Sequence, residues 1–578
     1  MPVIEINPNE LRRLAGADER DEETLIDDLF ALGLEFEGRT EDEEFQLEFA
    51  PDRLDRLSVE GVARSLRYQY GNDRGVHVPR LNPATWTIEV DDSVPSARSA
   101  IAGAVIRNVN LDDKSLASLI QLQEKLHSTM GRRRVKGAIG IHDLTMMKGA
   151  PATQAGGASI TYRGIDLDED HFVPLEADRE MTPGQVLTNH PTGREYAHIT
   201  KEYTHCPAIY DEIGLFSFPP IINGRRTEVT TDSTDLLIEL TGTDQWTIDK
   251  MLAIVCYAFD ARGATIEAVD VSYPDMTLVR PDLEVDTKRV SHRLIERTLG
   301  IELSGEEVID LIERSGLSSD VSDTSDGLVY DVEIPPYRVD VLHPIDIVDD
   351  IGRAYGFNQL KPQYPEVATV GDRHEESRFE RAVRGLLTGL GFEDLLNFNL
   401  ISVNDNFDRM GISPTYDGLG GGRPPRIREP YSEEYEITRT WALPSLMMVL
   451  ENNTHRRYPQ ELSEIGLATT VDESINTMVD ERRTVAGVLA RTDASFEAAK
   501  SRLQAIARRF EVSVETTATS HPTFIDGRTA TISFGSEPVG ILGEVHPAIL
   551  EEHQLEVPVA AFEFDLAGLQ AAIQLTHE

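Results

Sequence analysis

Strand-like and helix-like segments alternate along most of this 578-residue chain. Residues 112–131 and 244–263 carry apolar residues at helical spacing and end at a glycine, whereas runs such as TWTIEV and DLLIEL are typical of strands. No segment repeats with a period of about 20–50 residues, which argues against a solenoid. At roughly 150 residues per domain, the length indicates about four domains of mixed α+β and α/β character.

Composition shifts and turn residues divide the chain at three places. Residues 1–84 predict a small α+β domain with the order helix, helix, strand, helix, and residues 85–275 predict a larger α/β domain. Residues 276–358 predict a compact helix–strand module. Residues 359–578, which begin at a proline-containing boundary, predict a domain with a long helix and several strands.

The chain is strongly acidic, with 100 acidic and 55 basic residues and a formal net charge of −45. A nucleic-acid-binding protein ordinarily has a basic stripe, so composition alone argues against an RNA partner. The acidic residues, however, spread over every segment and form no single tail. At about 1 M salt the Debye length falls to ~3 Å, and a solvated acidic surface then keeps a protein soluble. The charge therefore predicts a salt-rich environment, and the function has to be inferred from motifs.

Membrane and disulfide signals are weak. The longest apolar run, Met251–Phe259, is far shorter than the ~20 residues of a membrane span, and the first residues lack a basic and apolar leader. We therefore expect a cytoplasmic protein with no membrane contact. Cys206 and Cys256 have no metal-ligand spacing around them and are expected to be buried and unpaired.

Four aspartates gather in the segment IPPYRVDVLHPIDIVDDIGRAYGF. Pro344 suits the first position of a helix, in which Asp346, Asp349 and Asp350 share one face, while Asp340 ends the preceding strand. Carboxylates at such spacing repel one another, and a divalent cation with oxygen ligands would relieve the repulsion. The segment predicts a magnesium site or, in a chain this acidic, a solvated face without a metal.

Glu239 lies in the apolar strand LLIEL, whose end delivers Thr241 to the start of a helix. A buried carboxylate needs a hydrogen-bond donor, and a strand end that opens onto a helix N-terminus can receive a polar ligand. The segment predicts a polar binding site. The alternative is that Thr241 or Thr243 caps the helix and Glu239 faces solvent.

The aspartate segment resembles a module of the phenylalanyl-tRNA synthetase β subunit. The resemblance is carried by P-x-R-x-D, then D-x-x-D-D and R-A-Y-G. It implies that Asp340, Asp346, Asp349 and Asp350 hold magnesium at the junction with an α subunit, and that residues 276–358 form a magnesium-binding module.

A second resemblance, to the editing domain of archaeal and eukaryal members of that family, is carried by SFPP-I-I-N and I-E-L-T-G-T. It implies that Ser217, Glu239 and Thr241 line a pocket in residues 85–275 that receives tyrosine on mischarged tRNA. Such a pocket is needed because an apolar synthetic site rejects an isostere with one added hydroxyl by only about 10². Glu239 would accept the phenol hydrogen bond, while Thr241 and Ser217 orient the ester or an attacking water.

The densest basic run of the chain comprises Arg132, Arg133, Arg134 and Lys136. In a member of this family it predicts contacts to phosphates of the tRNA acceptor end. The alternative is a helix C-terminus whose cations suit the helix dipole.

Residues 429–466 resemble the class II synthetase-like fold of the family, an antiparallel sheet domain. A working class II site requires an arginine near the end of the chain to stabilise ATP phosphates, yet no Lys or Arg follows Arg528. We therefore expect residues 359–578 to be a degenerate, pseudo-catalytic domain.

The resemblance covers the whole chain and implies an α2β2 heterotetramer that joins phenylalanine to tRNA(Phe). ATP and synthesis would belong to the α subunits, magnesium would be shared, and this chain would supply editing of Tyr-tRNA(Phe), tRNA binding and subunit assembly. Two alternatives stay open: a freestanding hydrolase of mischarged tRNA, and a non-enzymatic tRNA-binding scaffold.

Overall fold

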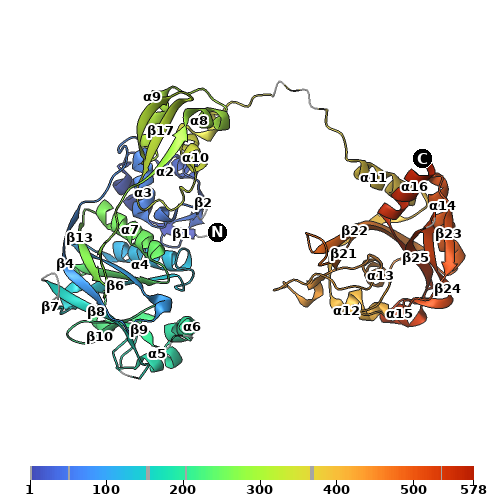
Figure 1. Cartoon of the computed structure of the whole chain (residues 1–578), viewed down its shortest axis with the longest axis horizontal. Helices are drawn as coiled ribbons and strands as arrows, with labels where there is room; N and C mark the ends of the chain where they lie inside the picture. The colour runs from blue at the N-terminus through green and yellow to red at the C-terminus, as the bar shows by residue number, and fades with distance from the viewer. Residues whose placement is uncertain are drawn as a thin grey trace. The chain divides into compact units, whose positions relative to one another are not determined.

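The computed structural model describes residues 3–49, 52–151, 157–168, 170–201, 203, 205–364, 367, 370–535 and 537–577. The chain forms two compact units, Met1–Tyr364 and Pro365–Glu578. Their division falls within the proline-containing segment KPQYPEVATVGD. Figure 1 traces the elements of each unit.

The first unit begins with a three-stranded sheet and three helices. The strands, in the order β1–β3–β2, span Val3–Ile6, Phe45–Phe49 and Leu34–Arg39, and the helices are α1 (Pro8–Ala15), α2 (Glu22–Ala31) and α3 (Val59–Gln69). Asn7, Asp21 and Ser58 cap these helices with their side-chain oxygens. The three predicted helices are present, but the pattern predicted one strand where the structure has three, because each strand is short and carries charged residues on its open face.

A large mixed sheet follows and forms the framework of the candidate site. Its main strands lie in the order β11–β10–β9–β8–β4–β13–β5–β12–β6, with β7 beside β8 and β14 beside β13. In chain order the strands span Leu81–Val90 (β4), Ala100–Arg107 (β5), Gly137–Asp143 (β6), Ala150–Pro151 (β7), Ala158–Ile165 (β8), Cys206–Tyr210 (β9), Leu215–Phe218 (β10), Ile222–Asn223 (β11), Leu236–Gly242 (β12), Thr265–Ser272 (β13) and Thr277–Arg280 (β14).

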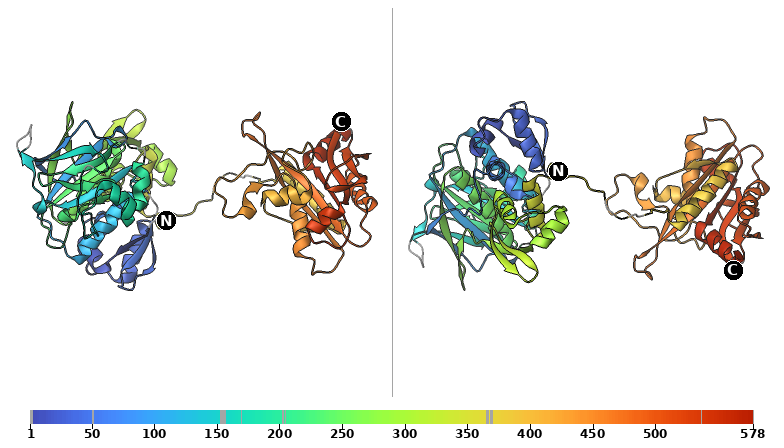
Figure 2. Two further views of the ribbon diagram at one scale, coloured as in Figure 1. Left: turned by 90° about the horizontal axis from the view of Figure 1, so that it is seen from below. Right: turned by 90° about the horizontal axis from the view of Figure 1, so that it is seen from above.

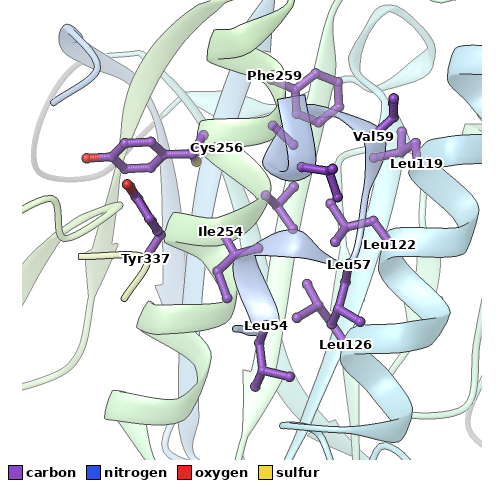
Figure 3. Close-up of a cluster of buried hydrophobic side chains, with 14 of the residues drawn as sticks. Leu54, Leu57, Val59, Leu119, Leu122, Leu126, Ile254, Cys256, Phe259 and Tyr337 are labelled. Carbon is purple, nitrogen blue, oxygen red and sulfur yellow. The ribbon is translucent and has the colours of Figure 1, made fainter. Parts of the chain in front are cut away.

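Two long helices, α4 (Asp113–Ser128) and α7 (Gln245–Ala261), pack on one face of this sheet, as the helical spacing predicts. Their apolar residues share a core with the start of α3, shown in Figure 3. The labelled members of this core are Leu54, Leu57, Val59, Leu119, Leu122, Leu126, Ile254, Cys256, Phe259 and Tyr337. Two shorter helices, α5 (Pro183–Asn189) and α6 (Pro191–Thr200), lie between β8 and β9 in the sequence. Because this core is shared, helix α3 of the N-terminal part packs against the helices that cover the large sheet.

The large sheet curls so that strands distant in its order approach each other. Ser217 on β10 lies 3.0 Å from Glu239 on β12, and the side-chain nitrogen of Asn223 on β11 lies 3.5 Å from the carbonyl oxygen of Ile141 on β6. The two edge strands of this sheet, β11 and β6, therefore lie close together, and residues from both line a cavity between them.

The third sheet of the first unit has the order β15–β17–β16, spanning Asp286–Ser291, Gly327–Ile334 and Ser318–Thr324. Helices α8 (His292–Leu299), α9 (Gly305–Arg314) and α10 (Pro344–Tyr355) pack on it. From the sequence alone, TKRVSHRLIERTLG (287–300) favours a helix throughout and SSDVSDTSDG (318–327) favours a turn-rich loop, and both predictions are wrong in part. Ser291 caps α8, so the preceding residues extend as β15, and the polar segment SSDVSDT pairs with β17 as an exposed edge strand.

The second unit contains a seven-stranded, mostly antiparallel sheet with helices on both faces (Figure 2). Its strands, in the order β18–β21–β22–β26–β25–β24–β23, span Glu393–Leu395, Gln460–Val471, Val479–Ala490, Val559–Asp565, Glu537–Val545, Phe524–Phe534 and Val514–Ala518. Helices α11 (Glu375–Gly389), α14 (Phe496–Arg509) and α16 (Leu566–His577) cover one face, and α13 (Leu443–Asn452) and α15 (Pro547–Glu552) cover the other.

None of the helices in the described part of the chain has the length and apolar character needed to cross a membrane. Cys206 and Cys256 are free and buried, as predicted.

Candidate functional site

Glu239 occupies the centre of the candidate site, on β12 between β5 and β6. It stands opposite Gly103 on one neighbouring strand and Gly140 on the other. A Cβ atom at Gly140 would lie 2.2 Å from Glu239 Oε1 and 2.9 Å from His142 Nε2. Only a glycine therefore leaves room for the carboxylate, a requirement that single-sequence reasoning missed because it depends on which strands are neighbours.

The carboxylate of Glu239 is 1% exposed and only partly satisfied. Ser217 Oγ lies 3.0 Å from Glu239 Oε1 and 3.1 Å from Asn223 Oδ1, so its single proton can serve one of them at a time. Among the described residues, Glu239 Oε2 and His142 Nε2 are buried without a hydrogen-bond partner. An unsatisfied buried carboxylate oxygen is costly, so it marks a place where a donor from a ligand or water would be favourable.

A cavity of about 370 Å³ reaches Glu239. One wall is a face of α4, another is the edge strand β6, and a third is the segment that follows β10. The apolar lining residues are Leu116, Leu119, Ile120, Ala138, Ile139, Ile141, Leu175, Pro219, Pro220, Ile221, Ile222 and Val229. The other lining residues are polar, and four of them are the glutamates Glu124, Glu176, Glu228 and Glu239. Apolar walls that reach the buried carboxylate of Glu239 suit a ring that ends in a hydroxyl.

Thr241 is fully buried and is held by Arg98, which lies at the end of a single 3-10 turn (Ser96–Arg98). Arg98 Nε donates to Thr241 Oγ1 at 3.0 Å and Arg98 Nη2 donates to the Thr241 carbonyl at 2.9 Å. Burial lowers the pKa of Arg98. Asp244 caps α7, and Thr241 and Thr243 do not. Glu239 is buried. The alternative prediction, in which a threonine caps the helix and Glu239 faces solvent, was therefore wrong.

The basic run adopts an unusual backbone. Arg132, Arg133 and Arg134 all have positive φ angles, of 46°, 53° and 65°. Such left-handed conformations cost on the order of 1–3 kcal/mol each and persist only where the surroundings hold them. Arg98 donates to the carbonyl oxygens of Arg134 and Val135 at 3.2 and 3.1 Å, so one buried guanidinium holds both this loop and Thr241.

The four basic side chains have different surroundings. Arg134 lines the cavity, donates to the Ile221 carbonyl at 2.9 Å and lies over the ring of Tyr196. Lys136 lies 3.1 Å from Asp244, whereas Arg132 and Arg133 are exposed and form no ion pair within the described ranges. Only this exposed pair is positioned to meet an external phosphate directly.

Glu124 and His127 of α4 complete the polar rim of the cavity. Glu124 Oε1 lies 3.1 Å from His127 Nδ1 and 2.9 Å from Arg134 Nη2. The hydrogen bond with His127, supported by Arg134, lowers the pKa of Glu124 to about 2, and burial lowers the pKa of His127. The rim therefore carries an ionised carboxylate and a neutral imidazole near pH 7.

The four aspartates do not meet in one cluster. Asp340 and Asp350 both accept from Arg338, at 2.6–2.8 Å, and Asp346 Oδ2 accepts from the backbone N–H groups of Leu342 and His343 at 2.8 and 2.6 Å. Asp349, which is half exposed, pairs with Arg353 at 2.8 Å. Burial opposes ionisation, but Arg338 still lowers the pKa of Asp340, and Asp350 and Asp340 raise that of Arg338.

This arrangement does not fit a magnesium ion held by this chain alone. Among the described residues, a group of three or more potential ligands close enough to share an ion occurs at Glu35, Glu37 and Glu48, on the acidic face of the N-terminal sheet, and not at the four aspartates. The cation that neutralises Asp340 and Asp350 is Arg338, the arginine of the P-x-R-x-D motif, to which the sequence reasoning gave no role.

In the second unit, a buried ion pair joins Arg439 to Glu464 at 2.7 and 3.0 Å. Arg439 is 1% exposed and also donates to the carbonyl oxygen of Leu467. This guanidinium is therefore satisfied internally.

The comparisons with known proteins agree on one family. A model of the "Phenylalanyl tRNA synthetase beta chain CLM domain" matches residues 360–566, and one of the "tRNA synthetase B5 domain" matches residues 288–357. A phenylalanine–tRNA ligase beta subunit from Natronomonas pharaonis is 63% identical over 571 residues, which cover 98% of this chain and all of that protein. The chain belongs to the phenylalanine–tRNA ligase β-subunit family.

Other family members agree. The β subunit from Haloarcula marismortui is 60% identical over 98% of this chain and all of its own length, and the relatives at 60–63% identity come from halophilic archaea. A solved N-terminal fragment of the phenylalanyl-tRNA synthetase beta-subunit from Pyrococcus horikoshii has 31% identity and a TM-score of 0.57, and it covers 61% of this chain and 99% of that fragment. The predicted family is confirmed, and the multidomain α+β fold is similar to that of the fragment.

Proposed function

We propose that this chain is the β subunit of a phenylalanine–tRNA ligase and that its cavity hydrolyses Tyr-tRNA(Phe). The observation that carries the proposal is the buried carboxylate of Glu239, a residue that lines the cavity and whose Oε2 has no partner in the described structure. Membership of the ligase family supplies the substrate class.

Selectivity for tyrosine follows from the buried oxygen of Glu239 that lacks a protein hydrogen-bond donor. A tyrosine phenol would donate to Glu239 Oε2 and remove the cost of an unpaired buried oxygen, whereas phenylalanine has no donor to offer it. A site built to hydrogen-bond a hydroxyl rejects the analogue without it by about 10⁴–10⁵. The pocket therefore accepts the wrong product and spares the correct one.

Hydrolysis in this pocket uses water. No Ser-His-Asp or Cys-His set lines the cavity among the described residues, so no protein nucleophile is required by the geometry. Thr241 is buried beside the cavity without lining it, and its Oγ1 accepts from Arg98. Its part in orienting the ester or the attacking water therefore stays a prediction that the family resemblance implies. Ser217 acts through Glu239, which it orients.

The tRNA acceptor end would approach from the basic loop. Arg132 and Arg133 supply phosphate contacts, which position a nucleic acid without reading its sequence. Arg134 stays in the cavity wall, and Lys136 supports the loop through Asp244. The strained backbone then serves to project two cations beside the cavity mouth.

Synthesis would take place on a separate α subunit in an α2β2 heterotetramer, where ATP is used. Two features of the second unit support this division. Arg439 is bound internally by Glu464, and no Lys or Arg follows Arg528. The same unit exposes an apolar strip after β18 that suits a protein partner: Leu396 is 89% exposed and Phe398 is 78% exposed.

The magnesium site on Asp340, Asp346, Asp349 and Asp350 stays a proposal that requires rearrangement. Arg338 would have to release Asp340 and Asp350, and an α subunit would have to add ligands. Replacing Asp349 and Asp350 with asparagine should then weaken α/β assembly and reduce bound magnesium. Unchanged magnesium content and tetramer population would remove these residues from a metal site.

The deciding experiment is deacylation of Tyr-tRNA(Phe) and Phe-tRNA(Phe) by the α/β complex and by this chain alone. Rapid loss of tyrosine with retention of phenylalanine supports editing. Equal activity without any α subunit, together with failure to co-purify with one, would favour a freestanding hydrolase. Tight tRNA binding without hydrolysis would favour a non-enzymatic scaffold.

A further inference from the structure

A second, smaller cavity of about 40 Å³ lies within the first unit, where α3 meets α9 and α10. Its lining includes five arginines, Arg53, Arg56, Arg64, Arg314 and Arg353. Only one carboxylate, that of Asp350, lines it. In a chain with a net charge of −45, such a local excess of arginine is exceptional.

The carboxylates around the cavity do not balance these guanidinium groups. Asp55 is shared by Arg53 and Arg64, at 2.8 and 3.2 Å, and Asp349 pairs with Arg353. Asp350 itself is bound by Arg338, whose Nη1 is buried without a partner in the described structure. Asp340 also pairs with Arg338 and Asp52 lies near Arg353, so Arg56 and Arg314 are the lining arginines without a carboxylate partner in the described structure.

Arg56 is the clearest unbalanced group. It is 5% exposed, and its contacts are to neutral oxygens only: Nε donates to Ser65 Oγ at 3.0 Å and Nη1 donates to the Leu32 carbonyl at 2.6 Å. Burial and repulsion by Arg53 lower the pKa of Arg56 to about 9. Arg314, in the same wall, donates to the Gln69 carbonyl and forms no ion pair within the described ranges. Buried charges are normally paired, because an isolated one carries a large desolvation penalty.

We propose that this cavity binds one small inorganic anion, with chloride as the fitting occupant. A monatomic anion fits a space of about 40 Å³, since one water needs roughly 10–15 Å³ measured in this way. It would supply the negative charge that Arg56 and Arg314 lack. A phosphate group is larger than this space, so a monatomic anion is the better fit.

The bound anion would connect separate parts of the first unit. Arg53, Arg56 and Arg64 precede or belong to α3, whereas Arg314 ends α9 and Arg353 lies near the end of α10. Anion binding would therefore join the N-terminal helices to the module that carries Asp340 and Asp350. This inference does not depend on the proposed editing activity.

The test is thermal unfolding of the full chain at constant potassium concentration, with glutamate replaced stepwise by chloride or bromide. A ligand that binds only the folded state raises its stability as the logarithm of ligand concentration above Kd. General effects of the two salts on the protein surface are shared by all variants, so the measured quantity is the Tm difference between wild type and each variant. Arg56→Met and Arg314→Met remove lining cations, and Arg80→Met, which removes an exposed arginine outside the lining, is the matched control.

The proposal predicts that the Tm deficit of Arg56→Met and Arg314→Met grows as chloride or bromide replaces glutamate, in proportion to the logarithm of halide concentration once that concentration exceeds Kd. Arg80→Met should show a constant difference. If Arg56→Met does not fold, the test uses Arg314→Met alone, since Arg314 is partly exposed and its loss disturbs the fold less. Deficits that do not change with the anion would overturn the proposal and assign the cavity to water.

Discussion

Replacing Glu239 with glutamine tests the selectivity mechanism, because it removes the charge of the pocket carboxylate and keeps its shape. Among the described residues, Ser217 donates to Glu239 Oε1 and no group donates to Oε2, so the phenol of tyrosine can contribute a hydrogen bond that phenylalanine cannot. A hydrogen bond to a charged group is worth about 1.5–3 kcal/mol, and about 1.4 kcal/mol corresponds to a tenfold change. We expect kcat/KM for Tyr-tRNA(Phe) hydrolysis to fall by about 10- to 150-fold.

The same substitution should leave or slightly raise hydrolysis of Phe-tRNA(Phe), since phenylalanine no longer leaves a buried charge unpaired. Glu228→Gln is the matched control, because Glu228 lines the same cavity but is exposed, and its loss should change either rate by less than about twofold. The assay is release of radiolabelled amino acid from each tRNA by the α/β complex. An unchanged ratio of tyrosine to phenylalanine hydrolysis in Glu239→Gln would refute the mechanism, provided that the unfolding temperature is retained.

Three further outcomes follow from the geometry. Gly140→Ala should lower Tyr-tRNA hydrolysis at least tenfold with little change in tRNA affinity, because the new Cβ would lie 2.2 Å from Glu239 Oε1. A normal rate would show that the Glu239 side chain can move to another position without loss of function. Changing Arg132 and Arg133 to alanine should raise KM for hydrolysis and weaken its salt dependence with kcat retained, and a pure kcat effect would exclude phosphate binding there. The pKa of Glu124, about 2, lies below its usual value of 4.5, so the ionised carboxylate stabilises the fold above pH ~4.5 and this contribution is lost as pH falls toward 2. Glu124→Gln should therefore lose less Tm than the unsubstituted protein between pH 4.5 and 2, which thermal unfolding measured at several pH values can check.

The elements with strong periodicity could be predicted from sequence. Helices 113–128 and 245–261 follow long apolar patterns with capping residues, and the LLIEL strand is fully buried. The strands at 286–291 and 318–324 could not be predicted, because they are polar edge strands held by pairing with β17 and not by an apolar face of their own.

The candidate site was predictable only in part. Glu239 was recognisable as a carboxylate in an apolar strand, but Arg98, which holds Thr241, lies 143 residues away in the sequence. Gly140 matters only because β6 pairs with β12 in one register. Spacing suggested that four aspartates need a cation, and it could not indicate that Arg338 already provides one for two of them.

In the proposed division of labour, this chain corrects mischarged products and another chain synthesises them. The most direct measurement is phenylalanine-dependent exchange of pyrophosphate into ATP, made with this chain alone and with an α subunit added. We predict no exchange by the isolated chain and full exchange by the α/β complex. Exchange by the isolated chain would contradict the account, because it would mean that this polypeptide activates phenylalanine by itself.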